Sequence, residues 1–337
     1  MEAFPAQSKG ASQAHTQSRQ AAVTATARLH FGFLDPSGRG KRPFGSFGLS
    51  LDRPRTRLSL KRAQALKVSG PERERAERYL KSISASCSVA EAFELRIEEA
   101  IPPHAGLGSG TQLALAVGSA FAALEGLSLD PQGIAARLGR GLRSGIGIAT
   151  FAQGGAVLDG GPREDDGLPQ PISRLPFPAE WRVLLIFDAT SSGLAGTSET
   201  TAFNSLPDFP ESKTDELYRR IMQDALPALA EADFKTFCEH VGYLQACMGA
   251  YFAPLQGGLY ASQRVGEVLE WLRSEGVIGL GQSSWGPTGF AFAASAAEGE
   301  ALLGQVRARD RHSGLGFALA QGRNEGAKIE TRAREIQ

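Results

Sequence analysis

The chain has 337 residues, 42% of them hydrophobic, and its 36 Lys and Arg residues balance its 36 Asp and Glu residues. This length suits one large domain or two, and the zero net charge gives no indication of nucleic-acid binding or of attraction to an anionic membrane. The three cysteines form no CxxC pair, and no apolar run approaches the roughly 20 residues of a membrane span. We therefore expect a reduced, cytoplasmic protein that binds neither nucleic acid nor a membrane.

The N-terminal half begins with a polar stretch, residues 1–22, that is rich in Ser and Gln and has no secretory signal, so we expect a disordered tail. Residues 23–35 predict a strand. A Gly-rich, basic stretch follows, and an alternating run at 55–63 predicts a further strand. A helix with a charged face is expected over 70–88. The run at 93–98 alternates apolar and charged residues, which is typical of an antiparallel strand with one face in solvent.

A helix is expected at about 109–125, and a second one begins with Asp130 as cap and Pro131 in its first turn. A short helix and a strand follow over 143–161. The elements expected beyond this point are strands at 181–189 and 316–321, a strand–loop–strand over 276–293, and helices over roughly 213–253, 261–275 and 296–308.

Strands and helices mix without a strict βαβ rhythm. We therefore predict an α+β fold with mixed or antiparallel sheets packed against helices. The Pro-rich, polar stretch at 161–180 is the best domain boundary. The predicted organisation is a tail over 1–22, an N-terminal domain over 23–170 and a C-terminal domain over 171–337.

The sequence GLGSG lies between the strand at 93–98 and the helix at 109–125. Gly106, Gly108 and Gly110 let backbone N–H groups approach an anion, while Ser109 and Thr111 add hydroxyl groups at the positive end of the helix. A dinucleotide fold fits poorly, because the preceding strand alternates instead of being buried on both faces. A Walker A loop is excluded because no Lys follows the glycines. A tight turn without a ligand remains the alternative.

Two further glycine-rich loops carry polar residues. Arg140 and Arg143 flank glycines in the loop at 139–155, where guanidinium groups would clamp a phosphate or carboxylate. Ser283 and Ser284 precede Trp285 in the loop at 279–292 and interrupt two apolar strands. The alternatives are surface arginines at a turn and a tryptophan packed beneath one.

Together the three loops resemble the GHMP kinase superfamily, named for galactokinase, homoserine kinase, mevalonate kinase and phosphomevalonate kinase. The stretch PPHAGLGSGTQLALA, residues 102–116, is similar to its central phosphate-loop motif. Gly110 replaces the second serine of that motif. Gly147 stands where several of these kinases carry an Asp that serves as base toward the substrate hydroxyl.

One branch of the superfamily fits better. The stretches TARLHFGFLD, IPPHAGLGSGTQLALAVG, GRGLRSGIGIATFAQGGAVLDGG and SSWGPT resemble the β-ribofuranosylaminobenzene 5′-phosphate synthase family of methanopterin biosynthesis. The resemblance implies a glycosyltransferase that condenses 4-aminobenzoate with 5-phosphoribosyl 1-pyrophosphate and releases CO₂ and pyrophosphate. It does not separate 4-aminobenzoate from 4-hydroxybenzoate. It also implies a homodimer and no use of ATP, and Mg²⁺ is expected to accompany pyrophosphate. An ATP-dependent small-molecule kinase of the same fold is the alternative, and a metabolite-binding regulator is the third hypothesis.

The resemblance leads to roles for individual residues. The predicted catalytic residues are Arg28, His30, Arg143, Ser283 and Ser284. The residues predicted to bind phosphate or other parts of the substrate are His104, Gly106, Gly108, Ser109, Gly110, Thr111, Arg140 and Asp35, and no metal-binding residue is predicted. His30 could instead be a core histidine, His104 could fill a turn, and Asp35 could cap a turn or bind a metal. The loop at 193–207, with Glu199, is predicted to be a mobile segment over the site.

Overall fold

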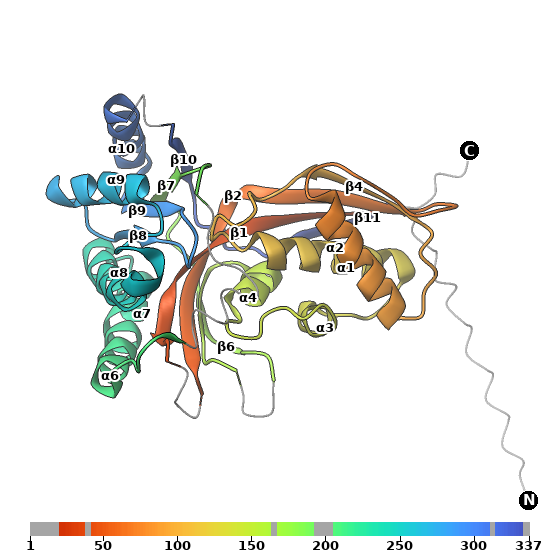
Figure 1. Cartoon of the computed structure of the whole chain (residues 1–337), viewed down its shortest axis with the longest axis horizontal. Coiled ribbons are helices and arrows are strands. Elements are labelled where there is room, and N and C mark those ends of the chain that lie inside the picture. Colours follow the sequence, from red (N-terminus) through yellow and green to blue (C-terminus); the bar gives the residue numbers. More distant parts are fainter. Residues whose placement is uncertain (1–19, 38–41, 163–166, 192–204, 311–313, 333–337) are drawn as a thin grey trace, which may run out of the picture.

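The computed structural model describes residues 20–37, 42–162, 167–191, 205–310 and 314–332. They form two β-sheets with packed helices, which confirms the predicted α+β class (Figure 1). Residues 1–19 of the predicted tail, and Glu199 with most of the predicted mobile segment, lie outside these ranges. No helix in the described ranges is long and apolar enough to cross a membrane.

The larger sheet contains seven strands from the described residues: β1 (Gln20–Asp35), β2 (Phe44–Arg62), β3 (Lys67–Ser69), β4 (Phe93–Glu99), β5 (Ala156–Asp159), β6 (Pro171–Leu175) and β11 (Lys328–Arg332). β2 is long enough to pair with two strands on one edge. Its first part, around Ser46–Leu49, pairs with β5, and its second part, Arg57–Arg62, pairs with β4. β1 pairs antiparallel with β2 along its other edge and is itself bordered by β11.

Four helices accompany this sheet: α1 (Arg73–Ser86), α2 (Ser109–Glu125), α3 (Pro131–Arg137) and α4 (Ile146–Gln153). The Ala- and Leu-rich α2 is buried on nearly all sides because it packs against β1 and β2 and is covered by the other helices. The glycine loop leads directly into α2, so this packing fixes the loop beside β1.

The second sheet has four antiparallel strands in the order β10-β7-β9-β8. Their bounds are β7 (Arg182–Phe187), β8 (Leu280–Gln282), β9 (Gly289–Ala293) and β10 (Gly316–Ala320). The accompanying helical segments are α6 (Glu211–Arg219), a π-helical turn η1 (Arg220–Ala225), α7 (Leu226–Ala230), α8 (Phe234–Gln256), α9 (Gln263–Ser274) and α10 (Ala296–Arg309). α8 contacts both β1 and β8 and so joins the two sheets. At this junction the ring of Phe31 packs against those of Phe47, Phe237 and Phe292.

Several segments differ from the sequence prediction, among them β3, which was not predicted. β2 begins at Phe44, inside the stretch expected to be only Gly-rich. Its glycine Gly48 allows close packing, since a Cβ there would lie 2.5 Å from the carbonyl oxygen of Leu29. β6 lies in the Pro-rich boundary region and pairs with β5. β11 was not predicted, because its five residues are all exposed and carry no core-facing pattern.

Candidate functional site

The glycine loop contains three residues in the left-handed region of the backbone. His104, Gly106 and Gly108 have φ values of 56°, 77° and 79°, a region that favours glycine. Gly108 is the residue immediately before α2. No acidic residue lies in the first turn of α2, so the positive end of this helix is not neutralised from within the turn.

The third loop packs directly on the glycine loop. A Cβ on Gly106 would lie 2.1 Å from the carbonyl oxygen of Ser283, so only glycine fits there. The Ser283 hydroxyl donates to the carbonyl of Gly106 over 2.7 Å and accepts from the backbone N–H of His30 over 3.1 Å. The hydroxyl proton of Ser283 is therefore engaged in a hydrogen bond within the protein. This geometry favours a positioning role for Ser283 over the predicted contact with substrate.

Three guanidinium groups surround the first turn of α2. Arg28 donates to the carbonyl of Gly106 over 2.6 Å, and a Cβ on Gly108 would lie 3.1 Å from its Cγ. At the next turn position, a Cβ on Gly110 would lie 2.8 Å from Nη2 of Arg140 and 3.8 Å from Nη1 of Arg75. The small Gly110 therefore makes room for Arg140 where the kinase motif has a serine.

Arg75 was not among the predicted site residues. It lies on α1, pairs with Glu72 over 2.7 Å, and its side chain is 18% exposed. The buried Nε atoms of Arg75 and Arg140 have no hydrogen-bond partner among the described residues. The sequence offered no indication of Arg75, because this residue is distant from the glycine loop in the sequence and is brought to it only by the packing of the helices.

The second loop is anchored by Asp159, which the sequence analysis also missed. This buried carboxylate accepts hydrogen bonds from the N–H groups of Gly145 at 2.8 Å and Gly161 at 2.9 Å, and from the Ser46 hydroxyl at 2.5 Å. Burial raises the pKa of Asp159 above its usual value, although these hydrogen bonds oppose the shift. Arg143 lies partly buried just before this anchored turn. The signal for Asp159 was a lone acidic residue ending an apolar strand before two glycines.

Gly147 lies on α4 against the first turn of α2. A Cβ on Gly147 would lie 3.1 Å from Cγ2 of Thr111, and the Gln112 amide donates to the Gly147 carbonyl over 2.8 Å. An aspartate here would need the neighbouring helix to yield. The position that carries a base in several kinases is thus tightly packed here.

His30 is buried, with only 3% of its surface exposed, and neither imidazole nitrogen has a hydrogen-bond partner among the described residues. Burial and then the nearby positive charge of Arg28 lower the pKa of His30 to about 3. The ring is therefore neutral near pH 7. β1 carries bulges between Thr26 and Arg28 and between His30 and Gly32, which depart from simple alternation along the strand.

The remaining predicted residues are less closely grouped. Asp35 is buried at the end of β1, roughly 20 Å along the strand from Arg28, and accepts from the Ser37 hydroxyl over 2.8 Å. This contact is the turn-capping arrangement named as its alternative. His104 is exposed. Ser284 has a φ of 57°, and its backbone N–H donates to the carbonyl of His30 over 3.1 Å.

Solved structures with the same architecture define the class of protein. A homoserine kinase from Cytophaga hutchinsonii superposes with a TM-score of 0.64 at 16% identity, covering 96% of this chain and all of its own. A mevalonate diphosphate decarboxylase from Staphylococcus aureus gives 0.65 at 14% identity, covering 93% and 98%. The family models for the GHMP kinases N terminal domain and the GHMP kinases C terminal match residues 74–155 and 225–312. The fold is that of the GHMP kinases.

Curated proteins place the chain more narrowly. The β-ribofuranosylphenol 5′-phosphate synthase of Archaeoglobus fulgidus is 31% identical over 329 residues, which cover 90% of this chain and 97% of the relative. The enzyme of the same name from Methanothermobacter thermautotrophicus is 29% identical and covers 79% and 86%. The chain belongs to the β-ribofuranosylphenol 5′-phosphate synthase family, which confirms the resemblance found in the sequence.

Proposed function

We propose that the protein is a decarboxylating ribosyltransferase of methanopterin biosynthesis. It would join a 4-substituted benzoate to 5-phosphoribosyl 1-pyrophosphate and release CO₂ and pyrophosphate. The observation that carries this proposal is the set of three arginines, Arg28, Arg75 and Arg140, at the N-terminal end of α2. The names of the curated relatives support the same reaction class.

The chemistry suits these residues. When pyrophosphate leaves the anomeric carbon of ribose, negative charge grows on its bridging oxygen and an oxocarbenium-like centre develops. Preorganised N–H groups of the glycine loop and the guanidinium groups would stabilise that leaving group, each contributing about 3 kcal/mol in a water-excluded site. No ribose hydroxyl has to lose a proton in this reaction. A glycine at position 147, where several kinases carry the base, is compatible with this chemistry.

The acceptor is the point on which the sequence resemblance and the relatives differ. The resemblance suggested 4-aminobenzoate, whereas the curated relatives are named for a phenol product. The two acceptors differ only in the group para to the carboxylate. We propose that the site takes this class of acid, and a direct competition between the two acids decides which is preferred.

We also propose that catalysis needs no ATP and that Mg²⁺ enters the site bound to the pyrophosphate group of the substrate. The described residues contain no group of three His, Cys, Asp or Glu side chains that could hold a metal ion. The arginines would contact phosphate oxygens, and the ion would screen the remaining negative charge. A homodimer remains the expected assembly, and size-exclusion chromatography with light scattering would test it.

The decisive experiment incubates the protein with 5-phosphoribosyl 1-pyrophosphate and carboxyl-labelled 4-hydroxybenzoate or 4-aminobenzoate, with and without Mg²⁺. We expect labelled CO₂ and pyrophosphate in equal amounts without added ATP. Absence of labelled CO₂ together with ATP consumption on an alcohol would replace this proposal with a small-molecule kinase. Tight binding of 5-phosphoribosyl 1-pyrophosphate without turnover would indicate a metabolite-binding regulator.

A further inference from the structure

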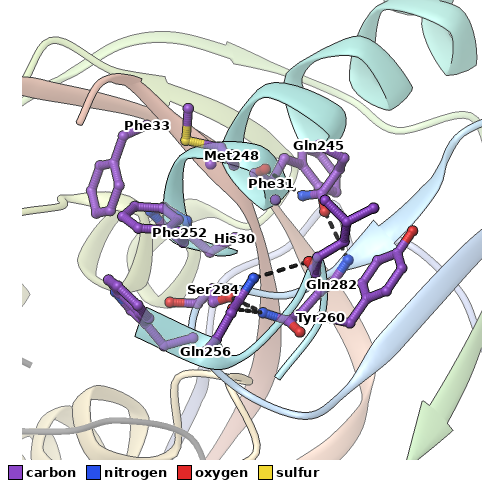
Figure 2. A pocket seen from close by; sticks show the side chains of 14 residues that line it. His30, Phe31, Phe33, Gln245, Met248, Phe252, Gln256, Tyr260, Gln282 and Ser284 are labelled. Carbon is purple, nitrogen blue, oxygen red and sulfur yellow. Dashed lines mark hydrogen bonds between the residues drawn. The ribbon is translucent and has the colours of Figure 1, made fainter. Parts of the chain in front are cut away.

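A pocket lies between β1, α8 and the third loop (Figure 2). Its walls are mainly aromatic and apolar, with Phe31, Phe33, Met248, Phe252 and Trp285 among the lining side chains. Flat, largely apolar walls with few polar groups are typical of a site for a small aromatic ligand.

Most polar groups of the pocket bind one another. Gln245 accepts from the backbone N–H of Gln282 over 2.7 Å, and the Gln282 amide donates to Gln256 over 3.2 Å and to the Ser284 carbonyl over 3.0 Å. Figure 2 shows these bonds linking one side of the pocket. The three glutamines therefore form part of the wall, and much of their hydrogen-bonding capacity is taken up by bonds within the protein.

One side chain of the pocket keeps hydrogen-bonding capacity for a ligand. Both imidazole nitrogens of His30 are buried and have no hydrogen-bond partner within the described part of the chain. A buried polar group left without a partner costs about 1–3 kcal/mol. A ligand that hydrogen-bonds to His30 would recover part of that cost.

The pocket adjoins the glycine loop. The backbone N–H of His30 donates to Ser283, whose hydroxyl donates to the carbonyl of Gly106. Gly286, just after Trp285, packs so closely on the loop that a Cβ there would lie 2.1 Å from the N atom of Gly106. A ring in the pocket would thus lie beside a ribose whose pyrophosphate is held at α2.

We propose that this pocket holds the aromatic acceptor, with the acceptor's para hydroxyl or amino group donating a hydrogen bond to the imidazole of His30. The inference rests on the proposed function and extends it by assigning the acceptor site. A neutral imidazole carries one nitrogen lone pair that accepts such a bond, and the low pKa of His30 keeps the ring neutral.

The contact gives His30 a chemical role. As the ring carbon bearing the carboxylate bonds to the anomeric carbon, the C–O bond to pyrophosphate breaks with its electron pair on pyrophosphate. Positive charge then develops on the para group, and the neutral imidazole of His30 stabilises it by accepting the hydrogen bond. The bond to the carboxylate breaks, CO₂ leaves, and that electron pair restores the aromatic ring, while the para group keeps its proton throughout. Atoms and charge balance without another reactant.

The acceptor must displace wall side chains to enter. The pocket volume is about 30 Å³ in this structure, which is enough for a water molecule or two. Leu259, at the wall, is 50% exposed, and the unbranched side chain of Met248 adapts easily to a new neighbour. We therefore expect binding of the acid to shift residues of α8 and the segment after it.

The test compares the affinities of 4-hydroxybenzoate and 4-fluorobenzoate, because fluorine is similar in size to a hydroxyl group but donates no proton. Calorimetric titration of the full chain should show up to about tenfold tighter binding of 4-hydroxybenzoate, the value of one hydrogen bond. His30→Phe should reduce that preference to less than twofold while its melting temperature is maintained. His240→Gln, on the same helix as Met248 but outside the pocket, is the matched control and should keep the preference.

The outcomes separate the two proposals. If the wild-type protein lacks the preference, or His30→Phe retains it, the pocket assignment is overturned even when labelled CO₂ is released. If the preference is present and sensitive to His30→Phe but no CO₂ is released, the acceptor pocket stands and the proposed reaction is wrong.

Discussion

Ser283 and Gly106, 177 positions apart, are joined by a hydrogen bond of 2.7 Å from the serine hydroxyl to the glycine carbonyl. The same hydroxyl accepts from the backbone of His30, so one side chain holds the third loop, the glycine loop and β1 together. The relative position of the glycine loop and the aromatic pocket therefore depends on the side chain of Ser283.

The first prediction concerns this link. Ser283→Ala removes one donor and one acceptor in a fully buried position, and we expect it to lower the free energy of unfolding by about 1–3 kcal/mol. Urea denaturation would measure the loss, alongside the Michaelis constant for 5-phosphoribosyl 1-pyrophosphate. Unchanged stability with abolished turnover would instead assign Ser283 a direct contact with substrate.

The second prediction concerns the arginines at α2. Arg140→Ala and Arg75→Ala should each weaken the binding of 5-phosphoribosyl 1-pyrophosphate by about 10- to 100-fold, because a charge-assisted hydrogen bond contributes roughly 1.5–3 kcal/mol. Arg137→Ala, an exposed arginine on α3, is the matched control. Calorimetry would give the affinities, and equal weakening in all three variants would point to a general effect of net charge.

The third prediction tests the tight packing at Gly147. Gly147→Asp places a carboxylate where several kinases have one, yet its Cβ would lie 3.1 Å from Cγ2 of Thr111 and its charge would enter a buried helix contact. We expect a destabilised protein with no gain of ATP-dependent phosphorylation. Appearance of kinase activity on an alcohol would show that the missing carboxylate alone separates the two reactions.

The fourth prediction uses the low pKa of His30. In the unfolded chain this histidine has a pKa of about 6.5, whereas burial lowers the pKa to about 3 in the folded protein. The unfolded state therefore binds more protons between these values, so stability must fall as the pH drops from about 6.5 toward 3. Between pH 7 and pH 5 wild type should lose about 2 kcal/mol more than His30→Phe. Parallel losses in both proteins, measured by urea denaturation, would contradict a buried neutral ring.

Local patterns in the sequence predicted much of the fold. The alternation at 93–98 gave β4, the Ala- and Leu-rich run gave α2, and Asp130 caps α3 by accepting from the Gly133 N–H over 2.7 Å. The start of β2 was not predicted, because its glycines were interpreted as a loop, whereas they allow other strands and helices to pack closely against β2. The residues that pack there are distant in the sequence.

Three of the groups named from the sequence, the glycine loop, Arg28 and Arg140, lie together at the first turn of α2, and their binding roles stay a prediction. The second half of the site depends on tertiary contacts. Arg75 reaches the glycine loop because α1 and α2 pack together. Asp159 anchors the second loop because Ser46 and Gly145, which lie elsewhere in the sequence, donate hydrogen bonds to its carboxylate. Residue type and spacing in the sequence do not predict these contacts.

The pairing of β11 with β1 has a consequence for how the chain is made. Residues 328–332 form the outer neighbour of Gln20–Thr24, so the sheet begun by the first described strand is completed by the last described strand. During synthesis, the edge of the early strand stays without this partner until residues 328–332 have left the ribosome. Exposed strand edges invite pairing with other chains. Nascent or C-terminally truncated chains should therefore be the species most dependent on chaperones.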